Sequence, residues 1–395
     1  MYFFINFFWI SLSVLFFCYI GYGLILLLLN AVKSIMVSSK LSSEAKEWLP
    51  VTLIVAAYNE EAILEQKISN TLAIDYPADK LNIIFITDGS ADESVNIINK
   101  YPSVTLFHQQ QRKGKFAAIK RAMQSVSTPV VIFSDANSML NKECIRRMVM
   151  HYQDQKTGGV AGEKKIIRTK QVSAIGEAEG LYWQYESFLK KQDAGFNSVV
   201  GAAGELFSIR TELFKPVNDE LILDDFVTSM QVCIQGYKIA YEPGAFATEL
   251  PSASLAEEEK RKTRIAAGAY QSIGYLKSCL NLFKYPLLAF QYISRRLLRW
   301  VCCPPLLLIL LISNLFIVSQ GLMPVFYTLF LYTQLFFYGM ALTGWLFVIE
   351  EKKAGILTIP FYFVFMNYCL LKGFYRFIKG RQTVLWEKSL RQAIE

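Results

Sequence analysis

The chain has 395 residues, of which 53% are hydrophobic, and its formal net charge is +8. A composition this apolar excludes a purely soluble protein. The basic residues occur in short runs and form no continuous basic surface of the kind that binds nucleic acid. Only two histidines are present, which excludes a histidine-rich zinc site and argues against a Ser-His-Asp triad. Any chemistry must therefore run on carboxylates and basic side chains.

The N-terminal segment, residues 1–33, is expected to form a transmembrane helix. Residues 2–32 carry no charge, and about 20 apolar residues suffice to cross a bilayer. A cleaved signal peptide is the alternative. It fits less well because the segment has no basic start and its apolar run exceeds roughly 15 residues. Lys33 and Lys40 follow the segment, so the next region is predicted to be cytoplasmic.

Residues 45–270 are predicted to form an α/β domain with a doubly wound mixed sheet. Short apolar runs without alternation are typical of strands buried on both faces. Such runs occur at 51–57, 81–87, 104–107 and 130–133. Apolar residues with helical spacing lie between them, which favours alternating strands and helices. For the less regular second half we expect a helix near 173–191, a glycine-rich strand at 199–209 and a helix from about 225 to 235.

Acidic residues stand at the ends of three of these apolar runs. Glu60, Asp88 and Asp135 each come directly after, or close behind, a predicted strand. Parallel sheets bind ligands at the carboxyl ends of their strands, so the three side chains should line one crevice. The commonest use for such a crevice is to hold a divalent cation with a phosphorylated substrate.

The rest of the chain is expected to return to the membrane. Residues 271–299 mix aromatic, aliphatic and basic side chains, as do amphipathic helices that lie on a membrane surface. Residues 300–377 should hold the C-terminal membrane segments. Their first part is uncharged as far as Ile349 and is broken near its middle at 319–324, which predicts two spans with a tight turn.

The segment 354–371 is harder to assign. It is uncharged but short, and Pro360 interrupts it, so it is either a third span or a re-entrant or interfacial segment. The tail, residues 378–395, is basic and should be cytoplasmic. Three C-terminal spans would place this tail outside, which favours a segment that does not cross.

Seven short motifs carry a resemblance to a known family. In chain order they are AYNEE, DGSADES, RKGKFAAIK, SDAN, GAAGELFSIR, LDDF with GYKIAYEP, and RKTRI. Together they resemble family 2 glycosyltransferases of the GT-A fold, and among these the membrane-embedded bacterial synthases of cellulose, chitin oligomers, poly-N-acetylglucosamine and hyaluronan. The resemblance covers residues 50–270 and, more weakly, 375–391. It implies a multi-pass protein of the bacterial inner membrane with a cytoplasmic catalytic domain.

For the donor side, the resemblance implies a nucleotide sugar, most simply a UDP-sugar, bound with Mg²⁺ or Mn²⁺. Asp135 stands where the family has the first carboxylate of its DxD motif, and Asn137 replaces the second, so the metal would be held with one charge fewer. Lys115 would contact the diphosphate. The residues implied for the nucleoside are Ala56, Tyr58, Glu60 and Asp88. Turn formation and helix capping are the alternative interpretations of these acids.

For the acceptor side, the resemblance implies that Asp225 is the general base, with Asp224 in place of the family's glutamate. Glu205 lies in the loop that would line the acceptor site. Arg264 matches the arginine of the family's QxxRW motif, but Arg261 replaces its glutamine and Ile265 its tryptophan. Trp386 in the tail resembles a second tryptophan motif, with a membrane-interface anchor as the alternative.

The expected function is an inverting, metal-dependent transfer of a sugar to a growing envelope or extracellular polysaccharide. Two alternatives stay open from the sequence. One is a single transfer to a lipid acceptor such as polyprenyl phosphate or a glycolipid. The other is an inactive membrane scaffold for a partner synthase, against which the joint presence of Asp135, Asp225 and Arg264 argues. Membrane lipid and the subunits of an export or synthase complex are the further expected partners.

Overall fold

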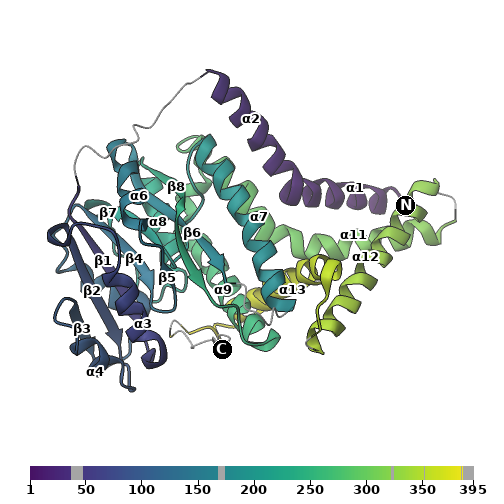
Figure 1. Ribbon diagram of the computed structural model, residues 1–395. Helices are drawn as coiled ribbons and strands as arrows, with labels where there is room; N and C mark the ends of the chain where they lie inside the picture. Colours follow the sequence, from purple (N-terminus) through teal and green to yellow (C-terminus); the bar gives the residue numbers. More distant parts are fainter. Residues whose placement is uncertain (37–47, 168–173, 322–323, 351, 384, 386–395) are drawn as a thin grey trace.

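The computed structural model describes residues 1–36, 48–167, 174–321, 324–350, 352–383 and 385. Figure 1 shows an α/β unit joined to a set of long helices that extend away from it. The sheet has eight strands in the order β3-β2-β1-β4-β7-β6-β8-β5. The strands are β1 Val51–Ala57, β2 Leu81–Asp88, β3 Thr105–Gln109, β4 Val130–Asp135, β5 Met139–Leu140, β6 Thr157–Ile166, β7 Phe207–Arg210 and β8 Lys238–Glu249.

The first half of the sheet is parallel. β1 pairs in parallel with β2 and with β4, and β2 pairs in parallel with β3. Every side chain of β1 is buried, because helices cover both faces, and this explains its apolar run without alternation. The covering helices are α3 Glu61–Leu72, α4 Ser94–Asn99, α5 Lys115–Met123 and α6 Cys144–Met150. The predicted doubly wound α/β fold is confirmed.

The second half is antiparallel around β7, which pairs with β4 on one side and β6 on the other. Its helices are α7 Ala174–Phe196, α8 Asp224–Ile234 and α9 Leu255–Tyr275. The glycine-rich strand expected at 199–209 is wrong in its first part, since β7 begins only at Phe207. Gly201 turns the backbone with a φ of +85°, and the N–H of Ala202 donates to Ser229 Oγ at 2.8 Å instead of to a strand. The chain before β7 is therefore a loop.

Four helices in the described residues are long and apolar enough to cross a membrane: Tyr2–Ile35, Pro286–Ser319, Val325–Ile349 and Gly355–Ile378. They contain α1 Tyr2–Phe16, α2 Tyr22–Met36, α10 Pro286–Tyr292, α11 Cys303–Ser319, α12 Val325–Ile349 and α13 Thr358–Ile378. π-helical segments at Phe17–Gly21 and Ile293–Cys302 join the pieces of the first two. Residues 286–299, expected on the membrane surface, thus continue directly into the second of these helices.

The segment expected to be re-entrant or to cross is helical and reaches Ile378. It packs along α9 of the α/β unit (Figure 1). A Cβ added to Gly373 would lie 2.4 Å from Ala266 Cβ, so only glycine permits the two helices to approach so closely. Tyr362 also donates a hydrogen bond to Glu258 at 2.8 Å. Whether α13 crosses the bilayer stays a prediction, but it is fixed to the α/β unit along its length.

Candidate active site

A cavity of about 710 Å³ lies at the carboxyl ends of β1 and β4. Walls from the α/β unit and from the candidate membrane helices enclose it. Most of the residues singled out in the sequence line it: Ala56, Tyr58, Glu60, Lys115, Asp135, Asn137, Glu205, Asp224, Asp225, Arg261 and Arg264. Asp88 does not line it, and Trp386 lies outside the described residues. The predicted crevice therefore exists and joins residues from both halves of the sheet.

Three charged groups from three different elements converge on the backbone of Gly204. Lys115 at the start of α5 forms an ion pair with Asp135 at the end of β4, with Nζ and Oδ1 2.6 Å apart. A Cβ placed on Gly204 would lie 2.9 Å from the Lys115 ammonium, 3.2 Å from Asp225 Oδ2 and 3.5 Å from Asp135 Oδ2. A larger side chain here would displace these charged groups from the space that they share.

The environment of Asp225 suits a proton acceptor near neutral pH. Burial and the adjacent charge of Asp224 raise the pKa of Asp225 to about 7, while Lys115 opposes the rise. Its Oδ1 accepts a hydrogen bond from the Phe226 N–H at 2.7 Å, which fixes the carboxyl at the start of α8. A carboxylate whose pKa lies near the working pH is an effective general base.

Lys115 and Asp135 show the opposing effects of burial and charge pairing. Burial alone would lower the pKa of Lys115, but Asp135, Asp224 and Asp225 outweigh it and raise that pKa. Burial raises the pKa of Asp135, and the ion pair with Lys115 only partly offsets this. A cation beside Asp135 would therefore be stabilising, because the carboxylate lies in a poorly solvated place with one positive partner.

The residues present fit a divalent cation that is shared with a substrate. In the described parts of the chain, no group of three or more His, Cys, Asp or Glu side chains could hold a metal ion. Asp135 and Asn137 offer a carboxylate and an amide oxygen on one short turn. Mg²⁺ is commonly held by only one or two protein carboxylates together with substrate phosphates and water. This donor set suits such a shared site better than a closed protein site.

Asp88 lies behind the cavity. Its carboxylate is fully buried and accepts hydrogen bonds from the backbone N–H groups of Lys113 at 2.9 Å and Gly114 at 2.7 Å. These bonds fix the loop that leads into Lys115, where Gly114 has a φ of +99°. The structure thus gives Asp88 a loop-ordering contact, and a direct contact with the nucleoside stays a prediction. Tyr58 does face the cavity, and the guanidinium of Arg112 lies 3.8 Å from the centre of its ring.

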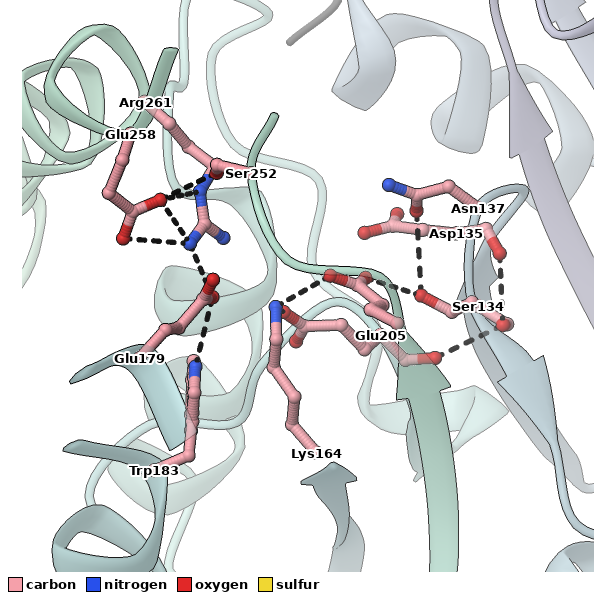
Figure 2. A network of polar contacts seen from close by, with 12 residues as sticks. Ser134, Asp135, Asn137, Lys164, Glu179, Trp183, Glu205, Ser252, Glu258 and Arg261 are labelled. Carbon is pink, nitrogen blue, oxygen red and sulfur yellow. Dashed lines mark hydrogen bonds and ion pairs between the residues drawn. The ribbon is translucent and has the colours of Figure 1, made fainter. Parts of the chain in front are cut away.

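A buried polar network, which the sequence did not reveal, connects the two sides of the cavity. Figure 2 shows Lys164 beside Glu205, with which it forms an ion pair. Lys164 also pairs with Glu249 at 2.7 Å. Ser138 Oγ donates to the same glutamate at 2.6 Å, and Ser134 Oγ donates to the Glu205 carbonyl at 3.0 Å. The turn that carries Asp135 and the loop that carries Gly204 are therefore held together from beneath.

A lysine from α3 completes this network. Lys67 is fully buried and donates to Ser134 Oγ at 2.9 Å and to the Ser138 carbonyl. Its two acceptors flank Asp135 and Asn137 in the chain. Burial lowers the pKa of Lys67 to about 8. The turn that would hold the cation is thus braced on both sides by one ammonium group.

The two arginines on α9 have different surroundings. The guanidinium of Arg261 lies between Glu179 and Glu258, and it donates to Glu258 Oε2 at 2.8 Å (Figure 2). It is thus engaged in a buried ion-pair cluster, which disfavours its predicted contact with diphosphate or acceptor. Arg264 faces the cavity. Burial lowers the pKa of Arg264, and the charge of Asp224 partly opposes this. Of these two arginines, Arg264 is therefore the better candidate for the predicted ligand contact.

The far wall of the cavity comes from α7 and the membrane helices. Glu186 on α7 accepts from Arg295 at 3.0 Å, Arg296 at 3.3 Å and Arg299 at 2.7 Å. This cluster fixes the second candidate membrane helix, Pro286–Ser319, to the α/β unit. Further wall residues were not predicted from the sequence, among them Tyr182, Trp183, Lys190, Trp300, Ile359, Phe363 and Met366.

Comparison with known proteins shows which family and which solved structure this chain is similar to. Residues 52–217 match the family described as glycosyl transferase family 2. The match covers less than half of the chain. The matched range includes Asp88, Lys115 and Asp135 but ends before Asp225 and Arg264, so the second half of the site lies outside it. The resemblance seen in the sequence is confirmed.

Over part of its length the chain is similar to curated polymer synthases. It is 28% identical over 234 residues to the poly-beta-1,6-N-acetyl-D-glucosamine synthase of Staphylococcus aureus (strain COL), covering 56% of this chain and 55% of the relative. It is 24% identical over 237 residues to the synthase of the same name from Staphylococcus epidermidis, covering 58% and 57%. The chain thus spans little more than half the length of these relatives.

A solved structure confirms the GT-A type of fold. The mannosyltransferase PcManGT from Pyrobaculum calidifontis, in complex with GDP-Man and Mn²⁺, superposes with a TM-score of 0.68. The alignment covers 94% of this chain and 99% of that protein at 17% sequence identity. It therefore includes membrane-helix regions as well as the α/β unit. At this identity the likeness concerns the fold.

Proposed function

We propose that the chain is an inverting, cation-dependent glycosyltransferase of the bacterial inner membrane, with its catalytic domain in the cytoplasm. It would transfer a sugar from a nucleoside diphosphate sugar, most simply a UDP-sugar, to a growing envelope or extracellular polysaccharide. The convergence of Lys115, Asp135 and Asp225 on Gly204 carries the proposal. The names of the curated relatives support a polymer product, and the GDP-Man and Mn²⁺ in the solved structure support the donor class and the cation.

The proposed reaction is a single displacement. Asp225 takes the proton of the acceptor hydroxyl, whose oxygen bonds to the anomeric carbon while the bond from that carbon to the diphosphate breaks. The electron pair leaves with the nucleoside diphosphate, next to Lys115. Asp135 and Asn137 would hold the Mg²⁺ or Mn²⁺ that neutralises charge on the leaving group. Attack from the side opposite the leaving group inverts the configuration.

The position of each residue in the cavity supports the proposed ligand roles. Ala56, Tyr58 and Glu60 lie at the end of β1, where a nucleoside would rest. Arg264 faces the cavity and would meet the diphosphate or the acceptor. Glu205 is held by Lys164, so its contribution is to fix the acceptor loop. The acceptor would enter from the wall that the membrane helices form.

The test is incubation of purified membranes with a panel of radiolabelled nucleotide sugars, with Mg²⁺, Mn²⁺ or a chelator. We expect cation-dependent incorporation into a polymer, and loss of incorporation in the Asp135→Ala variant. Incorporation that persists in the chelator and in Asp135→Ala would refute the cation site. No incorporation with any donor would favour a scaffold role.

Single transfer to a lipid acceptor is the second candidate. It is favoured by the apolar side chains of Ile359, Phe363 and Met366, which bring α13 into the wall of the cavity. Solvent extraction of the same reaction distinguishes the two. A product that partitions into the organic phase with one added sugar would support the lipid acceptor, and a product retained in the aqueous phase would support the polymer.

A further inference from the structure

Lys190 on α7 is a buried cation that lines the same cavity. Its side chain belongs to a residue that is 2% exposed, and its ammonium has no hydrogen-bond partner among the described residues. Its neighbours are aromatic: the ammonium lies 5.4 Å from the ring centre of Trp183 and 6.0 Å from that of Tyr241. Cation–π contacts of this length compensate only part of the lost hydration.

The nearby carboxylates are already engaged. Glu163 accepts hydrogen bonds from the hydroxyls of Ser187 and Tyr241, one at each oxygen. Glu205 pairs with Lys164. The negative charges of Glu163 and Glu205 stabilise the Lys190 ammonium electrostatically, but neither forms a hydrogen bond with it. Burial therefore dominates and lowers the pKa of Lys190.

Trp183 is surrounded by positive charge. Besides Lys190, the ammonium groups of Lys164 and Lys262 lie 5.0 Å and 5.9 Å from its ring centre. Lys164 has carboxylate partners within hydrogen-bond distance, and Lys262 has Glu258 at 3.6 Å. Lys190 is the member of this trio for which the described residues supply no such carboxylate. The positive charge at this wall is therefore incompletely balanced.

A buried and uncompensated cation on a cavity wall is stabilised when an anion binds there. We propose that Lys190, beside the ring of Trp183, forms a subsite for a phosphate-type anionic group of the acceptor. The proposal rests on the proposed glycosyltransferase function and deepens it by naming the chemistry of the acceptor. The subsite lies close to the reacting groups, since Lys164 bonds to Glu205, the chain neighbour of Gly204.

Two sources could present such a group. A lipid headgroup would enter beside the apolar side chains of Ile359, Phe363 and Met366, which line the same cavity. A free phosphate would need no apolar wall. Both would meet the Lys190 ammonium, so the subsite chemistry is shared and the experiment distinguishes the sources.

The experiment measures thermal stability of the full chain in nanodiscs without nucleotide sugar. The probes are phosphatidylcholine discs alone, the same discs with inorganic phosphate, and discs that contain phosphatidic acid. A ligand that binds the folded state raises Tm as its concentration exceeds Kd. Lys190→Gln is compared with Lys191→Gln, because Lys191 is the exposed neighbour on the same helix. Lys190→Arg keeps the positive charge and shows whether the protein still folds when this side chain is replaced.

We expect phosphatidic acid to stabilise the wild type and Lys191→Gln, and Lys190→Gln to need at least about tenfold more of it, as expected for one charge-assisted contact. Lys190→Arg should respond like the wild type. Stabilisation by inorganic phosphate alone, lost in Lys190→Gln, supports the site with a free-phosphate source. Equal responses of Lys190→Gln and the wild type, or no response of the wild type to either probe, overturn the proposal. The binding assay contains no nucleotide sugar. Its outcome therefore does not depend on whether the protein transfers sugar, and the two proposals can fail separately.

Discussion

Replacing Asp225 with asparagine should lower activity and raise stability together. The step in its pKa from 3.8 to about 7 corresponds to about 4 kcal/mol by which the fold disfavours the charged carboxylate. This is an upper bound because the side chain is partly exposed. Asparagine removes the charge and keeps an oxygen for the Phe226 N–H. The same substitution removes the proposed general base, and loss of a general base costs roughly 10²- to 10⁴-fold in rate.

The pH dependence has a definite sign. The folded-state pKa of Asp225 is raised, so the wild type loses stability as pH rises from about 4 to 7. The stability gain of Asp225→Asn should therefore be full near pH 8 and less than half as large near pH 5. Wild-type activity should fall about tenfold for each pH unit below 7, since only the ionised carboxylate accepts a proton.

The assay is Tm of the purified chain in chelator at both pH values, paired with initial rates of sugar transfer in cation. Asp219→Asn is the control, because Asp219 is a half-exposed carboxylate outside the cavity, paired with Lys120 at 2.6 Å. Its Tm should differ little from that of the wild type. If Asp225→Asn raises Tm by the same amount at both pH values, the raised pKa of Asp225 is refuted. If the variant keeps its transfer activity, the role of Asp225 as general base is refuted.

Three further substitutions separate the roles of other residues. Gly204→Ala should reduce the transfer rate far more than it reduces Tm, because its methyl group would lie 2.9 Å from the Lys115 ammonium at the catalytic centre; equal rates would contradict the geometry. Arg261→Met should lower the free energy of unfolding by about 3–5 kcal/mol, since it leaves the buried Glu258 without its main partner, and an unchanged denaturation midpoint would rule this out. Asp88→Asn should raise the KM for the donor about tenfold, because an amide oxygen replaces a charged acceptor of two loop N–H groups; a changed KM for the acceptor alone would argue otherwise.

Sequence patterns were sufficient for the parallel half of the sheet. Its central strands are buried on both faces, so the sequence of β1 shows an unbroken apolar run that ends where the site begins. β6 was missed because Gly158, Gly159 and Gly162 resemble a loop in sequence. Close packing demands those glycines: a Cβ at Gly159 would lie 2.7 Å from the Ser208 carbonyl oxygen of the neighbouring strand. Glycine in a strand that another backbone approaches is ambiguous until the partner is known.

The donor side of the site was predictable for a similar reason. Its acids follow strands, and strand ends meet at one edge of a parallel sheet. The wall opposite depends on pairings between distant segments. Residues 271–299 were predicted to lie on a membrane surface, but nothing local in the sequence shows that Glu186, more than a hundred positions earlier, accepts from Arg295 and Arg299. Lys190 carries no motif at all, and its importance appears only when burial and missing partners are known.

The candidate membrane helices contribute to the wall of the cavity. Arg299 extends from the second candidate membrane helix to Glu186 on α7, while α13 bonds to α9 through Tyr362 and Glu258. α7 and α9 both line the cavity. A displacement of either membrane helix would therefore move a wall that faces Asp225. It follows that the lipid environment should affect acceptor binding more than donor binding, because the proposed donor side is built on β1 and β4 and the wall opposite on α7 and α9.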